Sequence, residues 1–308
     1  MAIEPQKEHF QNPFLKYFLA TRPPFILASV VPVLVGLAYA HQQGYGIDAW
    51  TALLTLLAAI FLHAAVNVFN DYYDALNGTD ERNEQRIFPF TGGSRFIQNG
   101  VLTLHETRMF GIYLLLAVII IGVYLVIQVG IALILLGFTG IALGWAYSAP
   151  PLKLNSRGLG ELTVLIGFSL LPVGSCLVQT GHLSLDIFLV ALPGGLLTTS
   201  LLYINQFPDR ESDIAAAKMH VVARLEPRIA RWGYPLLAAL AYGLVFLLIL
   251  LKYLPPISLI SVIPALLSLK ASCILLHTAH RPHKLEPAIK LSIMAMLLHG
   301  LLLTLSLV

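Results

Sequence analysis

Long apolar stretches, separated by shorter polar segments, fill most of the chain. Nine of them approach the roughly 20 residues that a helix needs to cross the hydrocarbon core of a bilayer. They cover about residues 24–41, 49–69, 109–128, 130–147, 161–180, 186–204, 233–251, 257–277 and 286–307. The pattern predicts an all-α, polytopic membrane protein with nine transmembrane helices in a bundle.

Two polar segments are much longer than the others and cover residues 70–108 and 205–232. Both open on the pattern Asn-x-x-x-Asp with an aromatic third residue, beginning at Asn70 and at Asn205. Four spans lie between them and return the chain to the same side, so we expect the two motifs to face each other. We interpret the chain as one domain, 1–308, with two parallel pseudo-repeats, at about 23–147 and 161–277, and a ninth helix at 286–307.

The composition agrees with a membrane protein. Hydrophobic residues make up 57% of the chain and charged residues 11%, and the mean hydropathy is +0.79. A soluble domain carries about 25% charged residues, so this chain has too few to cover a surface that faces water. The net charge of +3 requires no nucleic-acid partner, because an anionic lipid leaflet and an anionic substrate account for it.

The positions of lysine and arginine predict the orientation. If the N-terminus is cytoplasmic, 16 of the 19 basic residues fall on the cytoplasmic side. Only Lys252 falls in an opposite loop, while Lys270 and Lys290 lie inside spans, nearer their cytoplasmic ends. Short cytoplasmic loops of membrane proteins are enriched in Lys and Arg. We therefore expect an integral multi-pass protein, in the inner or cytoplasmic membrane if the source is bacterial, with both long polar segments in the cytoplasm.

The first long polar segment begins with a group of carboxylate and amide side chains. If the second span continues as a helix, Asn67, Asp71 and Asp74 share a face, and Asn70 lies four residues before Asp74. Gly78 offers a place for this helix to end, so that the acid at position 80 can turn back towards the others.

The second segment repeats this chemistry with Asn205, Asp209 and Asp213. Carboxylate and amide oxygens suit Mg²⁺ held partly by the phosphates of a substrate. Acids at helix ends are often only solvated loop residues. Two clusters on one side favour a metal site instead, because carboxylates this close repel one another unless a cation lies among them.

Basic residues near these clusters are candidates for binding phosphate oxygens, since Arg offers two parallel donors and Lys a point charge. We select Arg22, Arg86, Lys153 and Lys218. The alternative is that they only reflect membrane orientation. The histidines, including His63 and His220, are interpreted as polar residues at the membrane interface rather than as metal ligands.

Four sequence motifs allow the chain to be compared with known families. They are Asn70-Asp71-Tyr-Tyr-Asp74-x₅-Asp80, Tyr147-Ser148-Ala-Pro150-Pro151-x-Lys153, Gly158-Leu-Gly160-Glu161 and Asn205-Gln-Phe-Pro-Asp209-x₃-Asp213-x₄-Lys218. In this order, and over essentially the whole chain, they resemble the UbiA superfamily of intramembrane aromatic prenyltransferases. The Gly-Leu-Gly-Glu run, the second Asn/Asp motif and the six-residue spacing from Asp74 to Asp80 are most similar to the branch that prenylates 1,4-dihydroxy-2-naphthoate in menaquinone synthesis.

The resemblance implies Mg²⁺-dependent transfer of a polyprenyl group from a prenyl diphosphate to an aromatic acceptor, with membrane lipid as a further partner. It implies that the acids Asp74, Asp209 and Asp213 are essential for catalysis. The metal and diphosphate candidates are Asn70, Asp71, Asp74, Asp80, Asp209 and Asp213, and the substrate-binding candidates are Arg22, Asn67, Arg86, Tyr147, Lys153, Asn205 and Lys218.

Several alternatives stay open at this level. Tyr147 could shield an allylic cation or anchor a helix at the interface, and Glu161 could cap a helix or contact the acceptor. The acceptor could instead be 4-hydroxybenzoate, homogentisate or a lipid. A transporter built from parallel repeats is a further possibility, but its acids should lie near mid-membrane rather than at the ends of spans.

Overall fold

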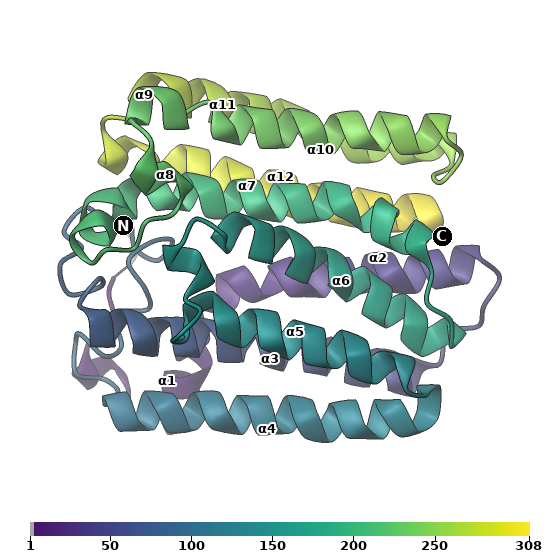
Figure 1. Ribbon diagram of the computed structural model, residues 1–308, viewed down its shortest axis with the longest axis horizontal. Helices are drawn as coiled ribbons and strands as arrows, with labels where there is room; N and C mark the ends of the chain where they lie inside the picture. Colours follow the sequence, from purple (N-terminus) through teal and green to yellow (C-terminus); the bar gives the residue numbers. More distant parts are fainter. Residues whose placement is uncertain (1–2) are drawn as a thin grey trace.

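The long helices lie side by side with their axes along one direction, with α4 along one edge of the bundle and α10 and α11 along the opposite edge (Figure 1). This computed structural model describes residues 3–308. The long helices are α2 (Pro23–Gln42), α3 (Ala49–Asn77), α4 (Leu104–Val129), α5 (Ala132–Ser148), α6 (Gly160–Thr180), α7 (Leu185–Ala215), α10 (Gly233–Leu250), α11 (Ala265–Thr278) and α12 (Glu286–Leu307).

Shorter helices occur at the ends of the bundle and in the connections. They are η1 (Lys7–His9), α1 (Pro13–Ala20), η2 (Leu154–Ser156), α8 (Val221–Arg224), α9 (Pro227–Ala230), η3 (Pro256–Val262) and η4 (Pro282–Lys284). The sequence pattern did not predict α1, whose first turn is capped by the Asn12 side chain.

The predicted fold class is confirmed. Within residues 3–308, eight helical segments are long and apolar enough to cross a membrane, and α5 is a shorter apolar helix of 17 residues. Large apolar side chains on α4 point outwards, with Ile120 70% and Ile127 74% exposed, as expected of a lipid-facing surface. The chain is therefore an integral, multi-pass membrane protein, with nine spans if α5 is included.

Three predicted spans end or begin differently in the structure. Helix α3 continues eight residues beyond position 69 to Asn77, and α7 continues beyond position 204 to Ala215. The extension of α7 is held by buried side chains, among them Phe207 and Ser212, which pack inside the protein although the sequence there is polar. The span expected at 257–277 is divided into η3 and α11, because Pro264 lies between them and cannot donate a helical hydrogen bond.

Helices α2 and α6 approach each other closely, and glycine makes this possible. A Cβ atom added at Gly36 would lie 2.0 Å from Ser175 Oγ and 2.3 Å from the backbone oxygen of Pro172. Small residues at such contacts allow helix backbones in membranes to pack tightly. This contact holds α2 against α6, which lines the cavity described below.

Replacing Gly36 by Ala is expected to destabilise the protein by about 1–3 kcal/mol, because the added methyl group meets backbone that cannot move aside. The measurement is the thermal unfolding midpoint in detergent. Gly243→Ala in α10 is the matched control, since a Cβ atom there meets nothing within 4 Å. Equal midpoints for the two variants would contradict the close contact.

Candidate active site

The two Asn/Asp motifs lie at the same end of the bundle, where α3 and α7 both finish (Figure 1). Helix α3 carries Asn67, Asn70, Asp71 and Asp74 and stops at Gly78, whose φ of 75° lies in the left-handed region that glycine adopts without strain. This is the helix end that the sequence predicts, and the turn after it places Asp80 beside the end of α3.

Lys218 joins the two motifs directly. Its Nζ lies 3.0 Å from Asp74 Oδ2 and 3.5 Å from Asp213 Oδ1, so one ammonium group pairs with an acid from each helix. Burial alone would lower the pKa of Lys218, but the carboxylates of Asp213 and Asp74 outweigh it and hold that pKa well above its ordinary value. Lys218 is therefore charged.

The loop after α3 completes the contact with α7. Asn83 Nδ2 donates to Asp209 Oδ1 at 2.6 Å, and the backbone N–H of Gly92 points to Asp209 Oδ2 at 3.4 Å. Gly93 follows with φ of 73°, and a Cβ atom there would lie 2.3 Å from Asp80 Oδ2. A side chain at position 93 would thus collide with the acid, so this position of the loop requires glycine.

His220 is a site residue that the sequence interpretation placed wrongly. It is 1% exposed, and its Nε2 lies 2.9 Å from Asp213 Oδ2. Because its Nδ1 accepts the backbone N–H of Ala223 at 3.1 Å, the proton of the neutral ring is on Nε2 and is donated to Asp213. The pattern Asp-x₆-His could have suggested this pair, but only the fold of the loop shows that His220 turns inwards.

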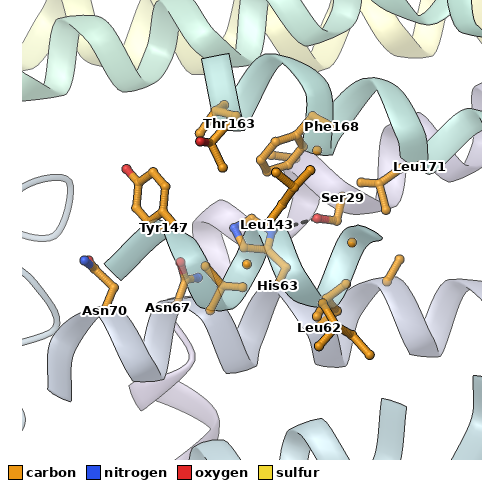
Figure 2. Close-up of a pocket in the computed structure, with 18 of the residues that line it drawn as sticks. Ser29, Leu62, His63, Asn67, Asn70, Leu143, Tyr147, Thr163, Phe168 and Leu171 are labelled. Atoms are coloured by element: carbon orange, nitrogen blue, oxygen red, sulfur yellow. Dashed lines mark hydrogen bonds between the residues drawn. The ribbon is translucent and has the colours of Figure 1, made fainter. Parts of the chain in front are cut away.

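The amide side chains of α3 hold neighbouring segments in place. Asn70 Nδ2 donates to Asp74 Oδ2 at 3.0 Å and to Ser148 Oγ at 3.1 Å, while Asn67 Nδ2 donates to the backbone oxygen of Thr21 at 3.0 Å. Both line the cavity, and the labelled view shows them on α3 near Tyr147 (Figure 2). Tyr147 is thus inside the protein rather than free at the interface.

Three predicted site residues lie elsewhere. Lys153 is exposed and does not line the cavity, and Arg86 pairs with Glu4 at 2.7 Å. The carboxylate of Asp71 is turned away from the cavity towards the backbone N–H of Ser94, at 3.2 Å, and towards Arg22, at 4.0 Å. Arg22 itself lines the cavity, as do Asn205 and the remaining predicted acids.

The site opens into a large apolar cavity of about 840 Å³. Its polar end is formed by Asp74, Asp80, Asp209, Asp213 and Lys218, and its long apolar part by side chains of α3, α4, α5 and α6 such as Leu62, Val118, Ile134 and Leu171. A charged head with an apolar tail would match this division. Ligand-binding pockets are typically lined by apolar side chains, with a few polar groups that orient the ligand.

The donor set fits a hard divalent cation. One oxygen each of Asp80 and Asn205 is buried without a hydrogen-bond donor among the described residues, and Asp213 Oδ1 has only the ammonium group of Lys218, at 3.5 Å. Burial raises the pKa of Asp80 well above its ordinary value, and the nearby carboxylates of Asp74 and Asp71 raise it further. Within residues 3–308, no three acidic, His or Cys side chains already converge as metal ligands, so phosphate oxygens would have to complete the coordination, as Mg²⁺ prefers.

Comparison with known proteins places the chain in one family. The profile of the UbiA prenyltransferase family matches residues 29–296. The 1,4-dihydroxy-2-naphthoate octaprenyltransferase of Escherichia coli is 32% identical over 211 residues, which are 66% of this chain and 66% of that protein. UbiA prenyltransferase domain-containing protein 1 of Xenopus tropicalis is 28% identical over 248 residues, 79% of this chain and 69% of that protein. The chain spans about two thirds of the length of these relatives.

Solved structures show the same fold. A UbiA homolog from Aeropyrum pernix superposes with a TM-score of 0.71 at 17% identity, over 92% of this chain and 98% of that one. A UbiA homolog from Archaeoglobus fulgidus, bound to DMAPP and Mg²⁺, gives a TM-score of 0.65 at 17% identity, over 94% of this chain and 99% of that one.

Proposed function

Since the chain belongs to the UbiA prenyltransferase family, we propose that it transfers a polyprenyl group from its diphosphate to 1,4-dihydroxy-2-naphthoate, in a Mg²⁺-dependent reaction. Relatives that carry this or a closely related activity in their names, from Escherichia coli, Haemophilus influenzae and Bacillus subtilis, support the acceptor. The family match also favours a prenyltransferase over a transporter. The observation that carries the proposal is Lys218, which ties Asp74 to Asp213 at the polar end of an apolar cavity.

The basic residues of the polar end would bind the diphosphate directly, and the acids would bind it through Mg²⁺. Lys218 and Arg22 offer positive charge to its oxygens, and Asp80, Asn205, Asp209 and Asp213 have the oxygens to hold Mg²⁺. When bound, Mg²⁺ would neutralise charge on the leaving diphosphate, an effect worth several kcal/mol in the transition state.

The apolar part of the cavity would hold the prenyl chain and exclude water from the allylic cation that forms when the C–O bond breaks. Tyr147 lines the cavity beside this position and can present its ring face to the cation. The electron-rich ring of the acceptor attacks the cation, and the ring carboxylate is lost afterwards as carbon dioxide.

We further propose that the site faces the cytoplasm. The predicted distribution of Lys and Arg supports this sidedness. The first described residues lie at the end of the bundle that carries the site, whereas the C-terminus lies at the opposite end (Figure 1).

The acceptor is tested with purified membranes, a radiolabelled prenyl diphosphate and a panel of acceptors. We expect a prenylated product with 1,4-dihydroxy-2-naphthoate, release of carbon dioxide, and loss of both when Mg²⁺ is removed with EDTA. Membranes with the Asp74→Asn variant provide the background. Product only with 4-hydroxybenzoate, homogentisate or a lipid acceptor would overturn the acceptor while leaving the family activity in place.

A further inference from the structure

A histidine lies in the apolar part of the cavity, away from the acids of its polar end. His63 belongs to α3 and lines the cavity, although the sequence interpretation placed it at the membrane interface. Its Nδ1 is 2.7 Å from Ser29 Oγ of α2, and its ring packs against that of Phe168 of α6 in a T-shaped pair, with centroids 5.4 Å apart and an interplanar angle of 83°. Figure 2 shows these three side chains together, with the second ring nitrogen of His63 on the side away from Ser29.

The imidazole of His63 is a polar group among apolar side chains, and a bound prenyl chain alone would not explain its presence. A prenyl chain has no polar atom, and burying an imidazole without hydrogen bonds costs free energy. Ser29 satisfies only Nδ1, and Nε2 has no hydrogen-bond partner in the part of the chain that the structure describes. The free nitrogen and the aromatic side chain of Phe168, which also lines the cavity, together suit a flat ring that carries a hydroxyl group.

The distance along α3 agrees with such a ligand. His63 lies one helical turn from Asn67 and two turns, about 10 Å, from Asn70 at the polar end. An aromatic ring held at Nε2 would therefore lie in the cavity next to the polar end, within reach of a prenyl group whose diphosphate is bound there.

We propose that His63 is the residue that recognises the acceptor, by accepting a hydrogen bond at Nε2 from a ring hydroxyl group. In that complex Nδ1–H donates to Ser29 Oγ, a hydroxyl that can accept it, so Ser29 is a positioning residue that holds the orientation of the ring, and Phe168 contacts the ring. This inference rests on the proposed function, in that the substrate is a hydroxylated aromatic ring. No proton has to leave the acceptor for the contact to form.

The test is steady-state kinetics of purified His63→Leu and Ser29→Ala with each substrate varied in turn. The KM for the acceptor is expected to rise about tenfold in His63→Leu, the effect of one ordinary hydrogen bond, while the KM for the prenyl diphosphate stays the same. Ser29→Ala should raise the acceptor KM less, and the double variant should be no worse than His63→Leu, because both act through one imidazole. His63→Gln, whose amide can reach the position of Nε2, should restore part of the affinity.

His299→Leu is the matched control. His299 is a fully buried histidine of α12 whose Nδ1 is also paired, with the backbone oxygen of Ser261 at 2.9 Å, but it does not line the large cavity. We expect unchanged KM values for both substrates, even if less protein folds. An unchanged acceptor KM in His63→Leu, or a rise confined to the prenyl diphosphate, would overturn the proposal.

Failure of the proposed function gives a different result. If the wild-type protein prenylates another hydroxylated ring, the kinetics are repeated with that acceptor and the inference on His63 is tested unchanged. If no aromatic acceptor is used at all, the inference falls together with the aromatic substrate.

Discussion

Asp74→Asn and Asp209→Asn should each lower prenyl transfer by about 10²–10³-fold, the usual effect of removing one group that stabilises charge in a transition state. Both acids are at the polar end of the cavity, one on each helix, and Asn keeps their size while removing the charge. The measurement is initial rate against Mg²⁺ concentration in membranes with equal amounts of the proteins. If the two acids serve one site, the double variant loses little more than the worse single variant.

Asp186→Asn is the control for this experiment. Asp186 is an exposed acid in the first turn of α7, at the other end of that helix, so its replacement should leave the rate unchanged. Wild-type activity and Mg²⁺ dependence in either site variant would contradict a shared metal and diphosphate site. A multiplicative loss in the double variant would indicate that the two acids act independently.

Lys218→Gln should destabilise the substrate-free protein by about 3 kcal/mol, because breaking a buried ion pair leaves an uncompensated charge. Here the loss leaves Asp74 and Asp213 facing each other without the ammonium group that now lies 3.0 Å and 3.5 Å from them. The measurement is the thermal unfolding midpoint in detergent without divalent cations. Adding Mg²⁺ with inorganic diphosphate should raise the midpoint of the variant more than that of the wild type.

A second lysine pair shows how far this effect depends on burial. Lys290 pairs with Glu286 at 2.7 Å, but its side chain is 56% exposed on α12. Exposed pairs one helical turn apart contribute about 0.3–0.5 kcal/mol, so Lys290→Gln should leave the midpoint nearly unchanged. Similar midpoints for the two variants would show that Lys218 does not neutralise the acids in the folded protein.

The sequence predicted those features that depend only on a short stretch of chain, such as the length of a span or the end of a helix. Span lengths follow from the thickness of a bilayer, and the end of α3 follows from Gly78, which adopts a left-handed conformation at little cost. The spacing of Asn70 and Asp74 places them on one helical face whatever surrounds them. The two pseudo-repeats and the catalytic roles of the acids remain predictions.

Contacts between distant segments were not predictable in the same way. From the sequence, Arg86, Lys153 and Lys218 were all candidates for binding phosphate oxygens. In the structure, however, Arg86 pairs with Glu4 and Lys153 is exposed. His63 and His220 were expected at the interface, and both lie inside. The partner of a side chain depends on the rotation of each helix about its axis and on the conformation of the loops. Neither can be predicted from the residue spacing within one segment.

By itself, then, the sequence determined an apolar helical bundle with two acidic motifs on one side, because hydrophobicity and helical spacing act locally along the chain. Only the tertiary structure decided that Lys218 joins the motifs, that Asn83 and His220 hold two of the acids, and that His63 faces the cavity. His220 and Asp213 are only seven residues apart, but the other two pairs, Lys218 with Asp74 and Asn83 with Asp209, connect residues more than a hundred positions apart. Those two contacts therefore exist only once helices α3, α6 and α7 have packed together.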